Sequence, residues 1–77
     1  LGRVKQARAN YQQCLDILLE LQSKNQLPGI RHNLSTAYEL LGATSRELGE
    51  LTVANDFFLK SLEHRRLWVE EVKDDPH

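Results

Sequence analysis

A six-position pattern occurs twice in this chain, with a constant offset of 47 residues (Leu48 against Leu1). In each unit a Leu-Gly pair is followed by an aliphatic residue, an alanine, an aromatic residue and a leucine. The members are Leu1, Gly2, Val4, Ala7, Tyr11 and Leu15, then Leu48, Gly49, Leu51, Ala54, Phe58 and Leu62. Self-similarity at a fixed period of a few tens of residues is typical of repeat proteins, whose units pack on their neighbours. The pattern therefore favours a function carried by a surface rather than by an active site.

Length and composition exclude several functional classes. A chain of 77 residues is at most one small domain with a thin core. Because it begins with Leu1, inside the repeat, we expect a piece of a longer protein. Its net charge of −1 gives no reason to expect nucleic acid or a membrane as partner. A single cysteine cannot form an intrachain disulfide, and no run approaches the roughly 18 apolar residues of a membrane span, so we expect a cytoplasmic protein.

Apolar residues recur at steps of three and four along three segments, which predicts three amphipathic helices over about 3–25, 30–48 and 51–73. The first stripe comprises Val4, Ala7, Tyr11, Cys14, Leu15, Leu18 and Leu21. The second comprises Ile30, Leu34, Ala37, Tyr38, Leu41, Ser45 and Leu48. The third comprises Leu51, Ala54, Phe57, Phe58, Ser61, Leu62, Trp68, Val69 and Val72. No window alternates with period two, so the sequence predicts an all-α fold without strands.

Glycine and proline mark where these helices end. Asn25, Pro28 and Gly29 end the first helix, and Gly49 follows the second, where a left-handed cap would place it. Both connections are short, so the helices are expected to be antiparallel. Gly42 lies inside the second helix, where it costs about 1 kcal/mol relative to alanine. That cost predicts close packing of another element against Gly42.

The stretch from Ser35 to Trp68 resembles a tetratricopeptide repeat (TPR), a helical hairpin of 34 residues. The resemblance rests on Tyr38, Leu41, Gly42, Gly49, Ala54, Phe58 and Ser61, which occupy the motif's characteristic positions. Small residues at Gly42 and Ala54 would let the two helices approach closely, with Phe58 filling the space beside them. The chain departs from the motif at Ser45, usually aromatic, and at Arg66, usually proline. Its longer period is similar to that of elongated TPR arrays in large bacterial multidomain proteins, some of them attached to protein kinases.

The resemblance implies one and a half hairpins of an α-solenoid: a second helix, then one whole hairpin. It implies a noncatalytic protein–protein interaction or scaffold module that holds a protein or peptide. In such arrays the first helices of the hairpins line a groove. The residues expected to face that groove are Thr36, Glu39, Ala43, Arg46 and Glu47. Glu39 and Ala43 argue against a clamp for a C-terminal carboxylate, because such clamps carry Lys and Asn there.

Residues with reactive or ligand-forming side chains form no catalytic or metal-binding motif. No His lies four residues from another His or a Cys, so no zinc signature exists, and His32, His64 and His77 are expected at the solvated surface. Cys14 lies on the first apolar stripe and is expected to be buried and inert. The acidic cluster comprises Glu70, Glu71, Asp74 and Asp75, and the basic cluster comprises His64, Arg65 and Arg66. Both are expected to be solvated, so we predict no enzyme, metal or cofactor.

Two other interpretations remain open. The chain could be a self-contained three-helix dimerisation or regulatory domain attached to a signalling enzyme such as a kinase. The heptad-like positions 51, 54, 58, 61, 65, 68 and 72 favour it, although Arg65 interrupts the seam. The chain could also be a sensor whose groove binds a small ligand or peptide and gates a catalytic domain. Because one and a half repeats leave apolar faces open, we expect homo-oligomers through the first or third helix.

Overall fold

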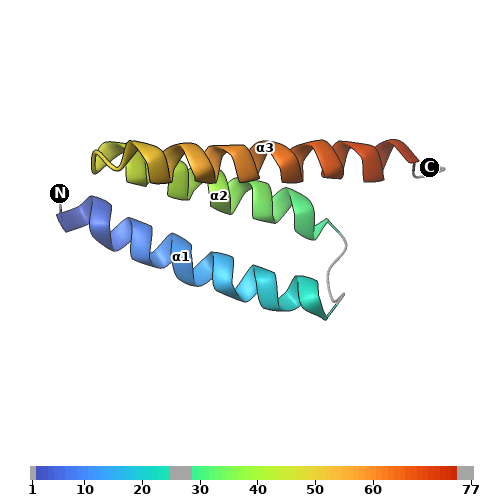
Figure 1. Cartoon of the computed structure of the whole chain (residues 1–77). Helices are drawn as coiled ribbons and strands as arrows, with labels where there is room; N and C mark the ends of the chain where they lie inside the picture. The colour runs from blue at the N-terminus through green and yellow to red at the C-terminus, as the bar shows by residue number, and fades with distance from the viewer. Residues whose placement is uncertain (1, 25–28, 75–77) are drawn as a thin grey trace.

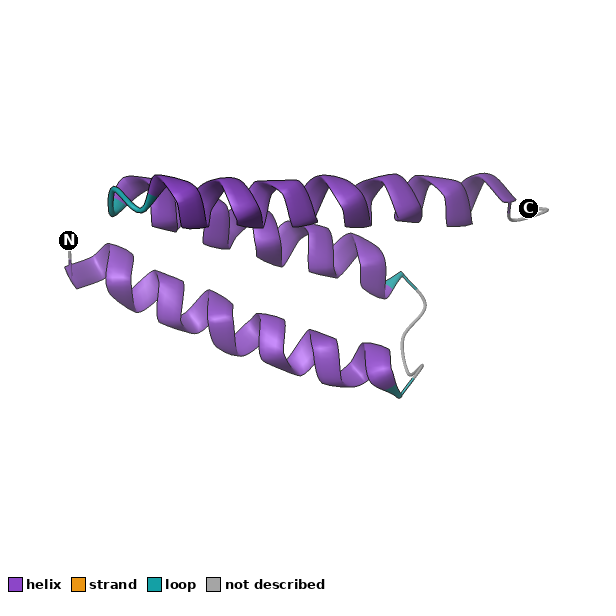
Figure 2. Cartoon of the chain, viewed as in Figure 1, coloured by secondary structure: helices purple, strands orange, loops and turns teal. Residues whose placement is uncertain are grey.

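Three helices make up the computed structural model, which describes residues 2–24 and 29–74 (Figure 1). They are α1 (Gly2–Ser23), α2 (Ile30–Glu47) and α3 (Leu51–Asp74). The described ranges contain no strand (Figure 2), and the helices pack into an elongated body of 46 × 20 × 17 Å. The predicted all-α fold of three packed helices is therefore confirmed. The expected starts at Ile30 and Leu51 are correct, and the other bounds differ by one or two residues; the expected end at Asn25 lies outside the described residues.

The turn between α2 and α3 is closed by backbone hydrogen bonds around Gly49. Gly49 has a φ of 81°, a left-handed conformation that a glycine adopts without steric cost. Its N–H donates to the Arg46 carbonyl over 3.0 Å, and the Glu50 N–H donates to the Ser45 carbonyl over 2.9 Å. This pair of bonds is the Schellman motif, which satisfies carbonyls left free at a helix end. The predicted cap at Gly49 is confirmed, and the short turn makes α2 and α3 an antiparallel hairpin.

Helix α2 is the central element of the fold. Its predicted stripe is largely buried, and Leu34, Leu41 and Ser45 are fully so. Both other helices pack against α2, whereas no Cα atom described in α1 lies within 8 Å of one in α3. Leu15 of α1 joins a cluster with four α2 residues, namely Leu34, Ala37, Tyr38 and Leu41. The three helices thus form an open row with α2 in the middle, rather than a closed bundle (Figure 1).

Close packing at Gly42 joins α2 to α3. A Cβ atom at Gly42 would lie 2.7 Å from a carbon of the Phe58 ring, closer than real Cβ contacts come. The prediction that another element packs on Gly42 is confirmed, but Phe58 lies directly over the glycine rather than beside it. One helical turn further along α3, the Ser61 hydroxyl donates to the Ser35 carbonyl over 2.8 Å. Ala54 and Ser61 are both 3% exposed, so small residues as well as the Phe58 ring are packed where α3 meets α2.

The apolar stripe of α3 is wider than the surface that α2 covers. Ala54 and Ser61 are buried, but Leu51, Leu62 and Val69 are each more than half exposed. Of the heptad-like seam, Ala54 and Ser61 are buried whereas Leu51 and Val72 are 66% and 50% exposed, so the seam is only partly packed. None of the helices among residues 2–24 and 29–74 is both long and apolar enough to cross a bilayer.

Candidate functional site

The five residues predicted to face a groove lie along one face of α2. Four are exposed and Ala43 is half-buried. Arg65 of α3 lies 3.5 Å from the Glu39 carboxylate, and the Arg46 guanidinium carbon lies 5.6 Å from the centre of the Phe58 ring. Glu39 and Arg46 therefore border α3, whereas Thr36 lies toward α1. The predicted residues share one helix face, but Glu39 and Arg46 contact side chains of α3, whereas Thr36 lines the hollow beside α1.

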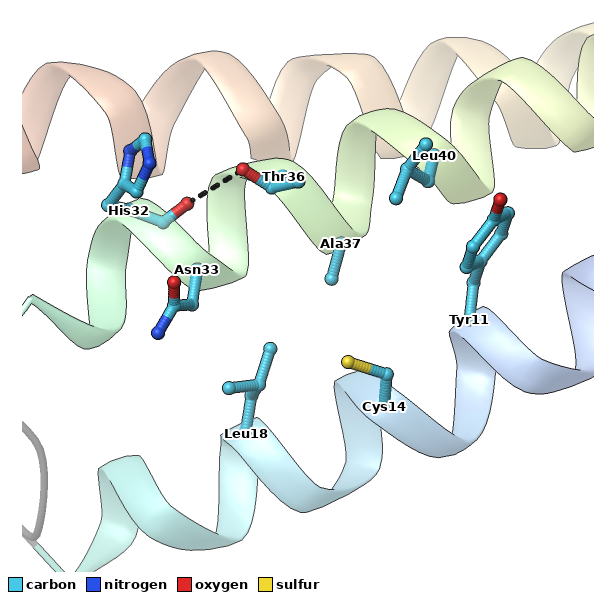
Figure 3. Close-up of a pocket in the computed structure, with 8 residues that line it drawn as sticks. All are labelled: Tyr11, Cys14, Leu18, His32, Asn33, Thr36, Ala37 and Leu40. Carbon is cyan, nitrogen blue, oxygen red and sulfur yellow. Dashed lines mark hydrogen bonds between the residues drawn. The ribbon is translucent and has the colours of Figure 1, made fainter.

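A hollow of about 520 Å³ lies between α1 and α2 (Figure 3). Its lining residues are Tyr11, Cys14, Leu18, His32, Asn33, Thr36, Ala37 and Leu40. We refer to these eight residues as the α1–α2 groove. Of the predicted face, Thr36 alone lines it. Sequence reasoning missed the rest because the groove depends on how α1 lies against α2.

The polar groups of the groove are few. The Cys14 sulfur and the Asn33 amide project into it from opposite walls (Figure 3). The Thr36 hydroxyl donates to the His32 carbonyl over 3.2 Å, so part of its bonding capacity is used within α2. Apolar side chains such as Leu18 and Ala37 form much of the remaining lining. The groove offers a largely apolar surface with a thiol and an amide at defined places.

Cys14 is exposed, so its predicted burial was wrong. Its counterpart in the 47-residue repeat is Ser61, which is buried because it packs on α2 and bonds to Ser35. The Cys14 thiol faces the α1–α2 groove (Figure 3).

His64 is half-buried, which corrects its predicted place at the solvated surface. Its ring stacks on Tyr38 with centroids 5.4 Å apart, and within the described residues its Nδ1 is buried without a hydrogen-bond partner. Burial lowers the pKa of His64, and the nearby Arg31 charge lowers it further, although Glu63 opposes both. Burial also raises the pKa of Tyr38. Both shifts favour the neutral form of the side chain, and the two rings pack against each other.

The environment of His32 differs from that of His64. His32 is exposed, as predicted, and its ring centroid lies 5.8 Å from that of Trp68. His77 lies outside the described residues. The two described histidines therefore lie at the surface and in packing contacts, and neither belongs to a group of described residues that could hold a metal ion.

A second hollow of about 360 Å³ lies where side chains of all three helices meet. It is lined by Lys5, Arg8, Ala9, Gln12, Leu41, Ser45, Val53 and Phe57. The Ser45 hydroxyl is buried here and has no hydrogen-bond partner in the part of the chain described.

Charged side chains near the C-terminal half of α3 are matched by neighbours. Arg66 pairs with Glu63 and Glu70 on its own helix, and Arg31 of α2 pairs with Glu71. Asp75 lies outside the described residues. In residues 2–24 and 29–74, no group of three or more His, Cys, Asp or Glu side chains could hold a metal ion.

The chain was compared with protein-family models, curated proteins and solved structures. None of the three comparisons finds a match.

Proposed function

We propose that this protein is a noncatalytic protein–protein interaction module built from TPR-like hairpins of an α-solenoid. In this proposal, the α1–α2 groove holds a peptide segment of a partner protein. The observation that carries the proposal is the groove itself, because its volume of about 520 Å³ is within the range of about 300–1,000 Å³ typical of ligand sites.

The open order of the helices supports a solenoid rather than a self-contained bundle. In a solenoid each helix contacts its neighbours along the row, and the stack leaves a surface between them. Among the described residues, α1 and α3 each pack on α2 and not on each other through their backbones. A closed three-helix dimerisation domain would instead bring α1 and α3 together.

The chemistry of the groove supports a peptide as its occupant. Apolar walls bind aliphatic or aromatic side chains, and a few polar groups fix their orientation. Leu40 is 37% exposed on the α2 wall, and the Asn33 amide can both donate to and accept from a peptide backbone. An extended segment with one or two apolar anchors matches this lining.

A peptide-display selection tests the proposal. Random 12-residue peptides are selected on the 77-residue protein, and the binders are compared on Leu40→Glu and Leu19→Glu variants. Leu40 and Leu19 are 37% and 38% exposed, but Leu19 does not line the groove. Groove binders should be lost on Leu40→Glu and kept on Leu19→Glu. They should also slow the reaction of the Cys14 thiol with a soluble disulfide reagent.

Selected peptides that bind both variants equally and leave the Cys14 reaction rate unchanged would refute the proposed groove. Circular dichroism of both variants controls for folding, because each substitution is at a partly exposed position.

A further inference from the structure

The second hollow lies at the end of the molecule where the start of α1 approaches the turn between α2 and α3 (Figure 1). Each helix contributes one face to it, because its lining residues are spaced three or four positions apart along α1, α2 and α3. We refer to its eight lining residues as the three-helix hollow. It shares no lining residue with the α1–α2 groove, so a ligand here is independent of the proposed peptide.

Ser45 gives the three-helix hollow an unused hydrogen-bonding group. The residue is fully buried, and its hydroxyl has no partner among the described residues. The other buried hydroxyls are paired: Thr44 donates to carbonyls of its own helix, and Ser61 bonds to Ser35. Burying an unpaired hydroxyl destabilises a folded protein. An acceptor atom supplied by a ligand would remove that cost.

Arg8 is held at the same end of the hollow by the α2–α3 turn. Its Nη1 donates to the Glu50 carboxylate over 2.7 Å, and the Glu50 N–H donates to the Ser45 carbonyl over 2.9 Å. These two bonds connect the guanidinium to the backbone of Ser45. A guanidinium has five N–H donors, so the bond to Glu50 leaves others for a ligand.

Lys5 adds a charge that the described residues do not neutralise. It lies one helical turn before Arg8 on the α1 wall, and none of the ion pairs in residues 2–24 and 29–74 involves it. Because Glu50 balances Arg8, the site has one positive charge in excess. A singly charged anion such as a carboxylate matches that excess better than a doubly charged phosphate does.

The remaining walls are largely apolar and select the body of the anion. Leu41 is fully buried, and Val53 is 42% exposed on the α3 wall. Phe57 is half-buried and offers a ring on which an aromatic ligand can pack. The volume of about 360 Å³ is near the lower end of the range of about 300–1,000 Å³ for ligand sites, which favours a small molecule.

We infer that the three-helix hollow binds a small organic monocarboxylate with an aromatic or aliphatic body. The carboxylate accepts hydrogen bonds from Lys5, Arg8 and Ser45. The apolar body packs on Val53 and Phe57. The end of a protein chain carries the same charged group, but the small volume favours a free acid.

The test titrates phenylpropionate into the isotope-labelled 77-residue protein and follows the backbone amides by NMR. The shifts should saturate and be largest at the residues that line the hollow. Phenylpropanamide lacks the charge and acetate lacks the apolar body, so each should bind at least about fivefold more weakly.

Two variants test the assigned contacts. Lys5→Gln should weaken phenylpropionate binding about fivefold or more. Arg3→Gln removes the same charge from an exposed α1 residue outside the hollow, so it should change binding less than about twofold. Ser45→Ala should weaken binding about threefold without lowering the melting temperature of the free protein, because its hydroxyl has no partner among the described residues. A merely structural serine would not give that combination.

Three results would overturn the inference. The first is the absence of saturable shifts up to about 10 mM phenylpropionate. The second is equal weakening by Lys5→Gln and Arg3→Gln. The third is a short peptide with a free C-terminal phenylalanine that binds the same residues more than about tenfold tighter than phenylpropionate, because the occupant would then be the end of a protein chain. None of these readouts involves Leu40 or Cys14, so failure here is distinguishable from failure of the proposed peptide groove.

Discussion

Replacing Gly42 tests the packing of the α2–α3 hairpin most directly. An alanine Cβ would meet three atoms of the Phe58 ring at 2.7, 2.8 and 3.0 Å, whereas carbon atoms pack at about 3.5–4.0 Å. The ring would have to retreat by roughly 1 Å. Overpacking of this kind costs about 1–3 kcal/mol, and alanine returns about 1 kcal/mol of helix propensity. We therefore expect Gly42→Ala to lower the free energy of unfolding by about 1 kcal/mol.

Gly42→Leu should be strongly disruptive, because it places three further carbon atoms where the Phe58 ring lies. We expect a loss of at least about 2 kcal/mol, against a total stability of about 4–12 kcal/mol for a chain of this length. Each kcal/mol shifts the melting temperature of such a domain by about 4–8 °C. Thermal and urea unfolding followed by circular dichroism would measure both effects.

Two controls separate packing from helix propensity. Gly2 is also helical but has no atom within 4 Å of a Cβ position, so Gly2→Ala should not destabilise the protein. In Gly42→Ala combined with Phe58→Leu, removing the ring should relieve the overlap, and the cost of the glycine substitution should disappear. If Gly42→Leu melted at the parent temperature, the close approach of α2 and Phe58 would be refuted.

Other contacts give three further predictions. Ser45→Ala should leave the free energy of unfolding unchanged or raise it, because it removes a buried hydroxyl that has no partner among the described residues. Ser61→Ala should lower the free energy of unfolding by about 1 kcal/mol, because it breaks the hydrogen bond to Ser35 of α2. Urea unfolding of the two variants measures the difference. Because folding lowers the pKa of His64, stability should be constant above the unfolded value of about 6.5 and fall as the pH drops below it. Melting at pH 7.5 and pH 5 should reveal this loss, and His64→Phe should reduce it. Cys14 should react with a thiol reagent in the folded protein; reaction only after unfolding would contradict its exposure.

The sequence was most informative where one helix is covered on both sides. The stripe of α2 could be identified from spacing alone because α1 and α3 together cover it, and Leu34 and Leu41 are fully buried. Gly49 was predictable because a left-handed cap has a strong residue preference. Gly42 was predictable because its cost inside a helix requires compensation. Phe58 was expected beside this glycine, but its position directly over Gly42 could not be predicted from the sequence.

Periodicity was less informative about α1 and α3. It shows which residues share a helix face but not how much of that face a neighbouring helix covers. Cys14 and Leu62 were therefore assigned to apolar faces that are in fact partly exposed to solvent. The environment of His64 depends on Tyr38, 26 residues away and on another helix. The α1–α2 groove likewise depends on the position of one helix against another, and spacing along one helix carries no such information.

The sparse burial of α1 has a consequence for how the groove is maintained. Of the described α1 residues, Leu15 alone is buried, whereas eight residues of α2 are. Local unfolding follows the number of buried contacts, so α1 should undock at a lower free energy than the α2–α3 hairpin opens. The groove exists only in the docked state. A peptide bound there would therefore hold α1 in place, and its affinity would include the equilibrium between docked and undocked α1.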